Sequence, residues 1–219
     1  MNFNTEYIFS IIPLFNSAAI VTLQLTFLGV FFSIIIGILG NIVYYYNIIV
    51  LKQIFKAYTE LSRNTPILAQ LFFLYFGLPQ FGIMLSGFLT GVIALSFLGG
   101  SYMLEALRGG IDSISKTQKE TAASLALSKS QALWLIIMPQ AAKTSLAAIS
   151  ANIIFLLRES SMVGFVAVAE IMHVANAQIG MFFRTNEVLL LVSIYYLVLI
   201  LPISLVFMFV ERRWQNGRA

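Results

Sequence analysis

The chain has 219 residues, of which 59% are hydrophobic and 10% are charged, and its formal net charge is +4. Soluble domains contain roughly 45–50% apolar residues, so this composition excludes an ordinary soluble domain and favours an all-α protein that crosses the bilayer several times. Cysteine is absent, which excludes disulfides and thiolate metal sites within the chain.

Three long stretches contain no charged residue: 7–51, 64–104 and 188–210. A membrane helix needs roughly 20 consecutive apolar residues, so each stretch has room for one or two spans. Glycine and proline residues divide the longer stretches. We therefore predict a single transmembrane domain, residues 1–219, with five spans at about 17–45, 53–77, 83–107, 132–157 and 187–210.

The first expected span begins near a polar pair, Asn16 and Ser17, and ends at three consecutive tyrosines, residues 44–46. Tyrosines at the end of a span are typical of the aromatic belt at a membrane surface. The residues before the span include an acidic one, Glu6, and no basic one, which is unlike a cleavable signal peptide. We therefore expect this span to be retained.

Polar residues interrupt the second expected span, 53–77. Pro66 disfavours a helical conformation at the residue before it, so the helix should break there and free backbone groups. Broken helices at membrane depth commonly line polar cavities. Asn64, Thr65 and Gln70 are therefore candidates for a substrate path, and a local helix cap is the alternative interpretation.

The third expected span, 83–107, approaches two adjacent glycines, Gly109 and Gly110. Glycine tolerates the left-handed conformation of a helix C-cap, so we expect the helix to end there. Near this end, Glu105 and Arg108 stand three residues apart, a spacing that favours an intrahelical ion pair with a structural role.

The stretch TQKETAASLALSKSQ at mid-chain has the composition of a surface helix. Thr117 stands three residues before Glu120, and Ser128 stands three residues before Gln131. This is the spacing of a capping box, in which two side chains satisfy each other's free backbone N–H groups at a helix start. The pattern predicts a short helix followed by a second helix that continues toward Leu157, and the two meet at a corner near residues 127–130.

This segment, about residues 110–131, is too short to fold as a domain and must rest on the membrane or on a partner. A helix that lies on lipid usually carries bulky anchors such as Trp or Phe opposite a strongly basic face, and this one carries small residues. We therefore favour docking on a partner protein. The candidate docking residues are Glu120, Ala122, Ala123, Leu125, Ala126 and Ser128.

Basic residues fix the expected orientation. Of the 13 lysine and arginine residues, all but Arg158 and Arg184 fall on one side of the five-span topology. The positive-inside rule then places the mid-chain segment and the C-terminus in the cytoplasm and the N-terminus outside. The positive net charge reflects this orientation, so we expect no nucleic-acid partner.

The stretch ETAASLALSKSQALWLIIMPQA closely resembles the cytoplasmic loop signature of permeases of ATP-binding-cassette importers, which reads E-A-A, three residues, G, nine residues, I-x-L-P. Glu120 opens the match and Pro139 closes it, whereas Thr121, Ala126 and Met138 depart from the pattern. Ala126 stands at the glycine position, in the turn between two helices. Two further stretches, YTELSRNTPILAQLFFLYFGLP and SYMLEALRGGIDSISKTQKE, look like other signatures of the polar amino-acid branch, the histidine and glutamine permease type.

The resemblance covers about residues 22–213 and implies a methionine-importer-like permease fold in a bacterial plasma (inner) membrane. It implies that a coupling helix within residues 116–131 is seated on a cytoplasmic ATP-binding subunit. It also implies import of a polar amino acid, an extracellular solute-binding protein that Glu170 is a candidate to face, and a second permease chain, identical or related. ATP and Mg would be bound by the partner ATPase, so we expect no cofactor and no enzyme activity here. In agreement, the sequence has no G-x-x-x-x-G-K-[ST] phosphate loop.

Arg158, Glu159, Ser160 and Ser161 form a polar cluster at the outer end of the fourth expected span. Ionisable residues within a membrane are unfavourable unless they pair or face water, so the cluster is a candidate functional site. In the resembling family this position lies beside the substrate path. We therefore expect Arg158 to attract the carboxylate of an amino acid and Glu159 its ammonium group. The alternative is an ion pair that satisfies itself at the interface.

Other classes of protein fit the sequence less well. His173 is the only histidine, so we expect no metal site. An ion-coupled secondary amino-acid carrier should show an internal repeat and acidic residues at mid-membrane depth, and the sequence shows neither. A non-transporting membrane scaffold is a further alternative, which the polar residues argue against weakly. A membrane hydrolase would need a nucleophile signature near the histidine.

Overall fold

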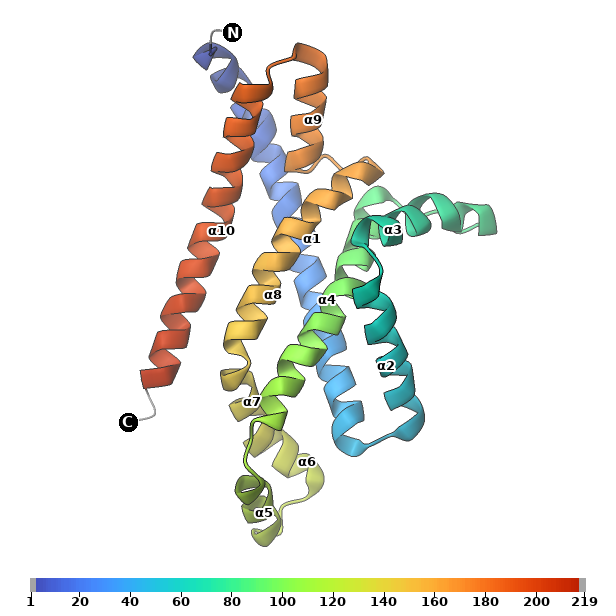
Figure 1. Cartoon of the computed structure of the whole chain (residues 1–219), viewed down its shortest axis with the longest axis vertical. Coiled ribbons are helices and arrows are strands. Elements are labelled where there is room, and N and C mark those ends of the chain that lie inside the picture. The colour runs from blue at the N-terminus through green and yellow to red at the C-terminus, as the bar shows by residue number, and fades with distance from the viewer. Residues whose placement is uncertain (1–2, 217–219) are drawn as a thin grey trace.

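The computed structural model describes residues 3–216, except for the side chains of Lys119, Ala123, Gln215 and Asn216. Within this range every regular element is a helix, and the helices form an elongated bundle (Figure 1). The helices long and apolar enough to cross a membrane are Thr5–Tyr46, Gly87–Asp112, Leu146–Val166 and Thr185–Trp214, with a shorter apolar run at Ile67–Phe81. The predicted all-α, polytopic architecture is confirmed.

Helix α1 (Thr5–Tyr46) begins well before the expected residue 17. The side chain of Asn4 caps it by accepting a backbone hydrogen bond at 3.0 Å. Ser17 does not interrupt the helix, because its hydroxyl donates to the carbonyl of Pro13 one turn earlier (3.2 Å). Asn47 follows the helix in the left-handed conformation (φ 53°) and turns the chain back.

The second expected span is divided. Thr65 is extended (φ −111°, ψ 124°), so the helix breaks before Pro66 as predicted. The run beyond the break projects sideways from the bundle (Figure 1). The parts are α2 (Ile49–Asn64), α3 (Ile67–Phe72), the π-helical η1 (Phe73–Gly77) and the 3₁₀-helical η2 (Leu78–Phe81).

Helix α4 (Gly87–Asp112) lies at the centre and packs along α1. Glycines on α1 permit a close approach of the two helices. A Cβ added at Gly29 would lie 2.8 Å from the Cβ of Leu95, and one added at Gly37 would lie 2.9 Å from the Cβ of Met103. These distances are too short for side chains larger than hydrogen.

The expected end of this helix at Gly109 and Gly110 is wrong, because α4 continues to Asp112. Gly110 serves packing instead of capping. A Cβ added there would meet the carbonyl oxygen of Ala141 at 2.5 Å, and also the hydroxyl of Ser145. Helix α7 (Met138–Thr144) therefore crosses α4 at this glycine.

The connection after α4 forms an elbow, which we define as residues 115–131. The fourth expected span, 132–157, is not continuous: a π-helical stretch precedes Pro139, and a second break falls at Ser145. Proline cannot donate a backbone hydrogen bond and its ring crowds the carbonyl one turn earlier, so the helix widens there. The elements are α5 (Lys116–Ser124), α6 (Lys129–Gln131), η3 (Ala132–Ile137), α7 and α8 (Leu146–Glu159).

Beyond α8 the chain forms two short helical segments before the last long helix, and its breaks do not coincide with Gly164 or Gly180. They fall at Ala167 (φ 60°) and Phe183 (φ 56°), which both adopt the left-handed conformation. The elements are η4 (Ser160–Val166), α9 (Ile171–Phe182) and α10 (Thr185–Asn216).

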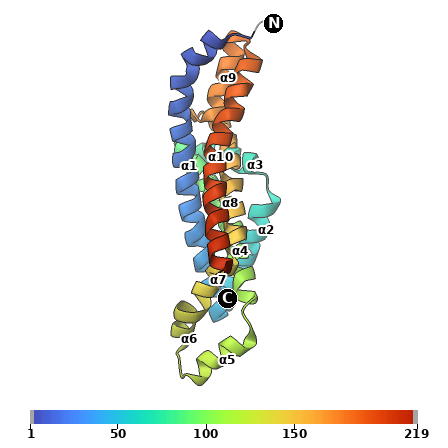
Figure 2. The same ribbon diagram turned by 90° about the vertical axis from the view of Figure 1, so that its left-hand side faces the viewer.

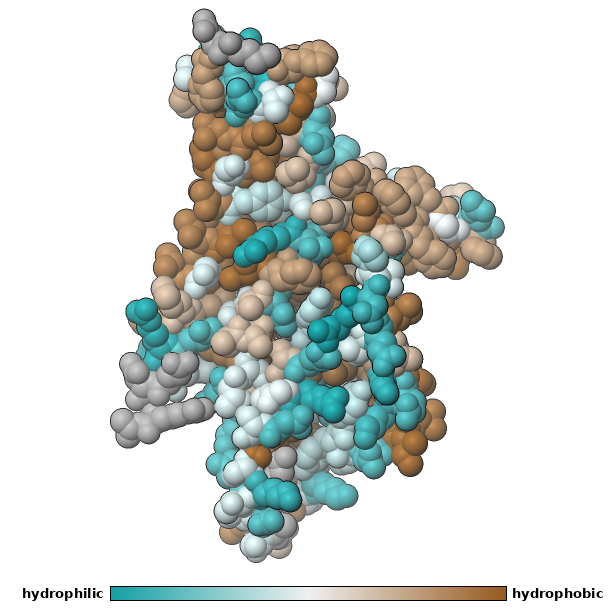
Figure 3. Space-filling view, viewed as in Figure 1, coloured by the Kyte–Doolittle hydropathy of each residue, from teal (hydrophilic) through white to brown (hydrophobic). Residues whose placement is uncertain are grey.

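The molecule has two distinct ends. The start of α1, α9 and the start of α10 lie at one end, and the elbow lies at the other (Figure 2). Hydrophobic residues gather over the upper part of α10 and over the projecting run beyond α3, whereas hydrophilic residues gather around α2, the lower part of α4 and the elbow (Figure 3). This distribution fits a bundle whose middle faces lipid and whose elbow faces water.

Candidate functional site

The elbow reverses the chain at Ala126. This residue has φ 54°, the left-handed conformation that follows many helix ends. The backbone N–H of Leu127 donates to the carbonyl of Ala122 at 3.2 Å, which is the bond that closes a Schellman motif. Within the elbow, the left-handed backbone position therefore coincides with the glycine position of the resembled signature.

One of the two predicted capping boxes is present. Ser128 and Gln131 satisfy each other's backbone N–H groups at 3.3 and 2.9 Å. The predicted box at Thr117 is wrong, because α5 begins at Lys116 and Ser115 accepts the capping hydrogen bond (3.4 Å). Ser115 directly follows Ile114, a buried residue that holds the start of the helix against the bundle.

The predicted docking residues do not all face outward. Ala122 is buried (1% exposed), because α5 packs on η3 through this side. Leu125 is 65% exposed, and Glu120, Ala126 and Ser128 are exposed as well. The side chain of Ala123 lies outside the described residues. Contact with a partner therefore remains a prediction for the four exposed residues, and Ala122 has an inward, supporting position.

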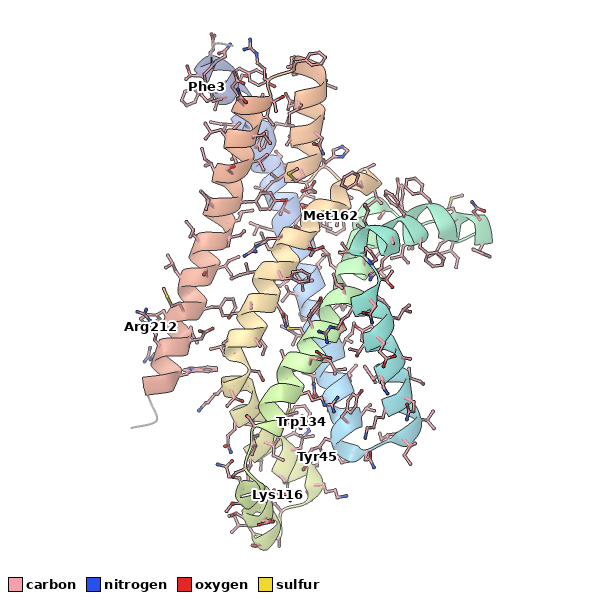
Figure 4. The ribbon with its side chains drawn as sticks, in the orientation of Figure 1. Phe3, Tyr45, Lys116, Trp134, Met162 and Arg212 are labelled. Atoms are coloured by element: carbon pink, nitrogen blue, oxygen red, sulfur yellow. The ribbon has the colours of Figure 1, made fainter. Side chains whose placement is uncertain are left out.

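The elbow is firmly joined to the bundle. Ile114, Leu133 and Ala141, which lie just before the elbow, on η3 and on α7, belong to one buried cluster that holds both ends of the elbow. Tyr45, at the end of α1, donates its hydroxyl hydrogen bond to the carbonyl of Lys129 (3.3 Å). Figure 4 shows Tyr45, Trp134 and Lys116 together at this end of the molecule. A displacement of the elbow would therefore reach several long helices.

The polar residues around Pro66 act mainly as local caps. Asn64 and Thr65 donate side-chain hydrogen bonds to carbonyls one turn earlier, at 2.8 and 2.7 Å. Gln70 bridges the break, since its Nε2 donates to the carbonyls of Ser62 (3.1 Å) and Thr65 (3.0 Å). Its Oε1 is buried without a partner among the described residues. Of the three, Gln70 alone has a buried polar atom without a hydrogen-bond partner in the described part of the chain.

An ion pair joins α2 to α4, and it differs from the predicted one. Glu105 pairs with Arg63, whose guanidinium also lies over the ring of Tyr102 (5.1 Å). Arg108 pairs loosely with Asp112 (3.7 Å). The predicted intrahelical pair is absent because the side chain of Glu105 faces the neighbouring helix.

The cluster 158–161 occupies the junction of α8 and η4. Arg158 is exposed and Glu159 is half-buried, and neither forms an ion pair within the described part of the chain. Ser160 is buried, and its hydroxyl donates to the carbonyl of Leu157 (2.7 Å). Ser161 is partly exposed. Because η4 packs against α3, the cluster lies near the helix that carries Gln70.

Glu170 was predicted to face an external partner, but it is fully buried (0% exposed). It caps α9 by accepting backbone hydrogen bonds from Met172 (2.9 Å) and His173 (2.6 Å). Burial raises the pKa of its carboxyl group to about 7, although these two hydrogen bonds oppose the change. A glutamate alone in an apolar stretch just before a helical pattern was the signal for this capping role.

The bundle, its interrupted helices and the projecting elbow define a polytopic helical membrane protein with the methionine-importer-like permease fold. The sequence profile described as "Binding-protein-dependent transport system inner membrane component" matches residues 29–216. The chain belongs to this family and is therefore the membrane component of a binding-protein-dependent transport system.

Relatives and solved structures agree with this assignment. A probable glutamine ABC transporter permease protein of Bacillus subtilis is 36% identical over 76% of this chain and 77% of its own. A probable amino-acid ABC transporter permease protein of Vibrio harveyi is 31% identical over 90% and 89%. The crystal structure of an amino acid ABC transporter with histidines has a TM-score of 0.89 and 32% identity, covering 97% of this chain and 100% of the other. An inward-facing MetNI methionine ABC transporter (TM-score 0.77, 18% identity, coverage 94% and 98%) shares the fold.

Proposed function

We propose that this chain is the permease subunit of an ATP-driven importer that moves a polar amino acid into the cytoplasm. The observation that carries the proposal is the elbow, in which the family signature coincides with a left-handed turn at Ala126 between two short helices. The named relatives are amino-acid permeases, which supports this substrate class. ATP and Mg are bound by a separate cytoplasmic subunit in this scheme, and an extracellular solute-binding protein delivers the amino acid.

Coupling runs from the elbow into the bundle. The ATPase binds the exposed residues around Leu125, and its movement displaces α5. Ala122 and Ile114 are buried beneath that surface, so they pass the displacement to η3 and α7. Gly110 then passes it to α4, because the carbonyl of Ala141 on α7 packs directly against this glycine.

The amino acid passes the 158–161 cluster and Gln70. Glu159 supplies the negative charge for the ammonium group, and Arg158 supplies the positive charge for the carboxylate. The unpaired Oε1 of Gln70 is an acceptor for a further N–H of the solute. A second permease chain, identical or related, completes the wall of the path, since a single bundle encloses little volume.

Reconstituted uptake tests the proposal. Proteoliposomes are prepared with this chain, its ATPase and its binding protein, and uptake of labelled amino acids is measured. We expect uptake to stop when the ATPase carries a substitution that blocks hydrolysis; continued uptake would contradict the proposal. Leu125→Glu should abolish both uptake and copurification of the ATPase, whereas Glu6→Gln, exposed at the start of α1 and at the opposite end of the molecule from the elbow (Figure 2), should leave both unchanged.

Glu159→Gln separates the substrate path from coupling. A lost hydrogen bond to a charged group should lower uptake roughly tenfold or more. Copurification of the ATPase should be unchanged, because Glu159 is the last residue of α8, at the end of that helix farther from the elbow (Figure 1). Glu6→Gln, a change of the same kind on the exposed start of α1, is the matched control and should import normally. Equal uptake in the two variants would exclude Glu159 from the path.

Orientation can be tested directly because the chain contains no cysteine. We place the elbow in the cytoplasm and the start of α1 outside. A single Leu125→Cys substitution should therefore react with a membrane-impermeant maleimide only in inside-out vesicles. Phe3→Cys should react only in right-side-out spheroplasts. The reverse pattern would refute this orientation.

A further inference from the structure

A single aromatic ring near the elbow is flanked by two cations from two different helices. The guanidinium carbon of Arg108, on α4, lies 4.7 Å from the centre of the Tyr44 ring. The Nζ atom of Lys52, on α2, lies 5.9 Å from the same centre. With Asn41 and Tyr45 they line a cavity of about 250 Å³, completed by Ile111 and Asp112.

The charges that line this cavity do not balance. Asp112 is its one carboxylate among the described residues, and it lies 3.7 Å from Arg108 in a loose, exposed pair. The Nζ atom of Lys52 donates to the neutral side chain of Asn47 (3.1 Å). Two cations and one carboxylate leave a net positive charge, and an aromatic ring attracts cations without neutralising them. An anion in the cavity would relieve the repulsion between the two basic groups.

The surroundings of the cavity identify the class of anion. Tyr44 is in the last turns of α1, at the end of a membrane-spanning helix, where lipid headgroups lie. The start of α2, just before Lys52, presents bare apolar side chains, with Ile49 and Val50 both 71% exposed. Acyl chains would cover these residues, whereas a free phosphate ion would leave them in water. The site therefore combines a polar pocket for a phosphate with an adjoining surface for hydrocarbon.

We propose that Lys52, Tyr44 and Arg108 bind the phosphate headgroup of an anionic phospholipid. Basic pockets between membrane helices are known to suit such headgroups. The lipid then links α1, α2 and α4 beside the elbow. Binding of this lipid does not depend on the transported solute. In the orientation proposed above the lipid lies in the cytoplasmic leaflet, and only that assignment rests on the proposed function.

Native mass spectrometry of the purified full chain tests this site. The probes are phosphatidylglycerol and phosphatidylcholine with the same acyl chains, and inorganic phosphate. Each basic side chain near a membrane surface contributes about fivefold to the binding of anionic lipid. Lys52→Gln and Arg108→Gln should therefore each weaken phosphatidylglycerol binding about fivefold, and the double variant about 30-fold. Lys56→Gln, an exposed lysine one turn further along α2 that does not line the cavity, should bind like the wild type.

Four results would overturn the proposal. The first is an equal loss in the Lys56→Gln variant, which would indicate diffuse attraction. The second is displacement of phosphatidylglycerol by millimolar inorganic phosphate, which would make the site a free-anion site. The third is wild-type binding of both lipids with the same affinity, a measurement that needs no variant to fold. If the ATPase instead protects Lys52 and Arg108 from chemical modification while lipid binding is unchanged, the surface is a protein interface and the proposal fails.

Discussion

Replacing Ala126 by glycine should stabilise the elbow. Ala126 is left-handed (φ 54°), and this conformation costs an L-residue about 1–2 kcal/mol. Glycine removes that strain but loses about 0.5–1 kcal/mol of the gain through its greater freedom in the opened chain. The net expectation is a stabilisation of about 0.5–1 kcal/mol, which would slow local opening about two- to fivefold.

The assay is hydrogen exchange of the intact protein, followed by mass spectrometry of the proteolytic fragment that spans residues 113–131. It reports local opening without requiring reversible unfolding of a membrane protein. Ala122→Gly, on the preceding helix α5, is the matched control. Ala122 is helical and buried, so glycine there should destabilise by about 1 kcal/mol and speed exchange. Faster exchange in both variants would refute the conclusion that the turn at Ala126 is strained.

Three further outcomes are expected. Gly110→Ala should destabilise the chain by about 1–3 kcal/mol because the new Cβ would meet the carbonyl of Ala141 at 2.5 Å, whereas Gly109→Ala, with nothing within 4 Å, should be neutral or stabilising in the same thermal unfolding assay. Because the pKa of Glu170 is raised from 4.5 to about 7, the folded chain binds a proton more tightly than the unfolded one; stability should fall by on the order of 3 kcal/mol as pH rises from about 4.5 to 7, and Glu170→Gln should flatten this profile. Ser128→Ala should weaken the elbow by about 1 kcal/mol, seen as faster exchange that begins at α6; unchanged exchange would show that the capping box is dispensable.

Features that depend on neighbouring residues were predictable from the sequence. The break at Pro66 follows from a clash between a proline ring and the residue before it, and the box at Ser128 and Gln131 follows from their spacing. The long charge-free stretches likewise predicted the long apolar helices α1, α4 and α10. The same local rule failed at Thr117, where the cap is Ser115, two residues earlier, because buried Ile114 holds the chain beside it.

Features that depend on packing between helices were not predictable. Gly110 looks like a helix terminator in sequence, but the crossing of α7 gives it a different role. Glu105 finds its partner, Arg63, on another helix. Glu170 looks like a surface residue in the sequence, but α9 and the preceding η4 of the same chain bury it. The structure was also needed to tell which of the proposed docking residues are exposed. A helical pattern of small residues does not say which side of α5 faces the bundle.

The glycine contacts between α1 and α4 determine where the protein can move. At Gly29 and Gly37 helix α1 presents no side chain, and Leu95 and Met103 of α4 pack directly against its backbone. Sliding or tilting of one helix would drive these side chains into the other, so we expect the pair to move as one rigid body. Opening and closing of a passage is thereby confined to seams filled by larger side chains, such as those along α8 and α10, and to the joints at Thr65 and Ser145.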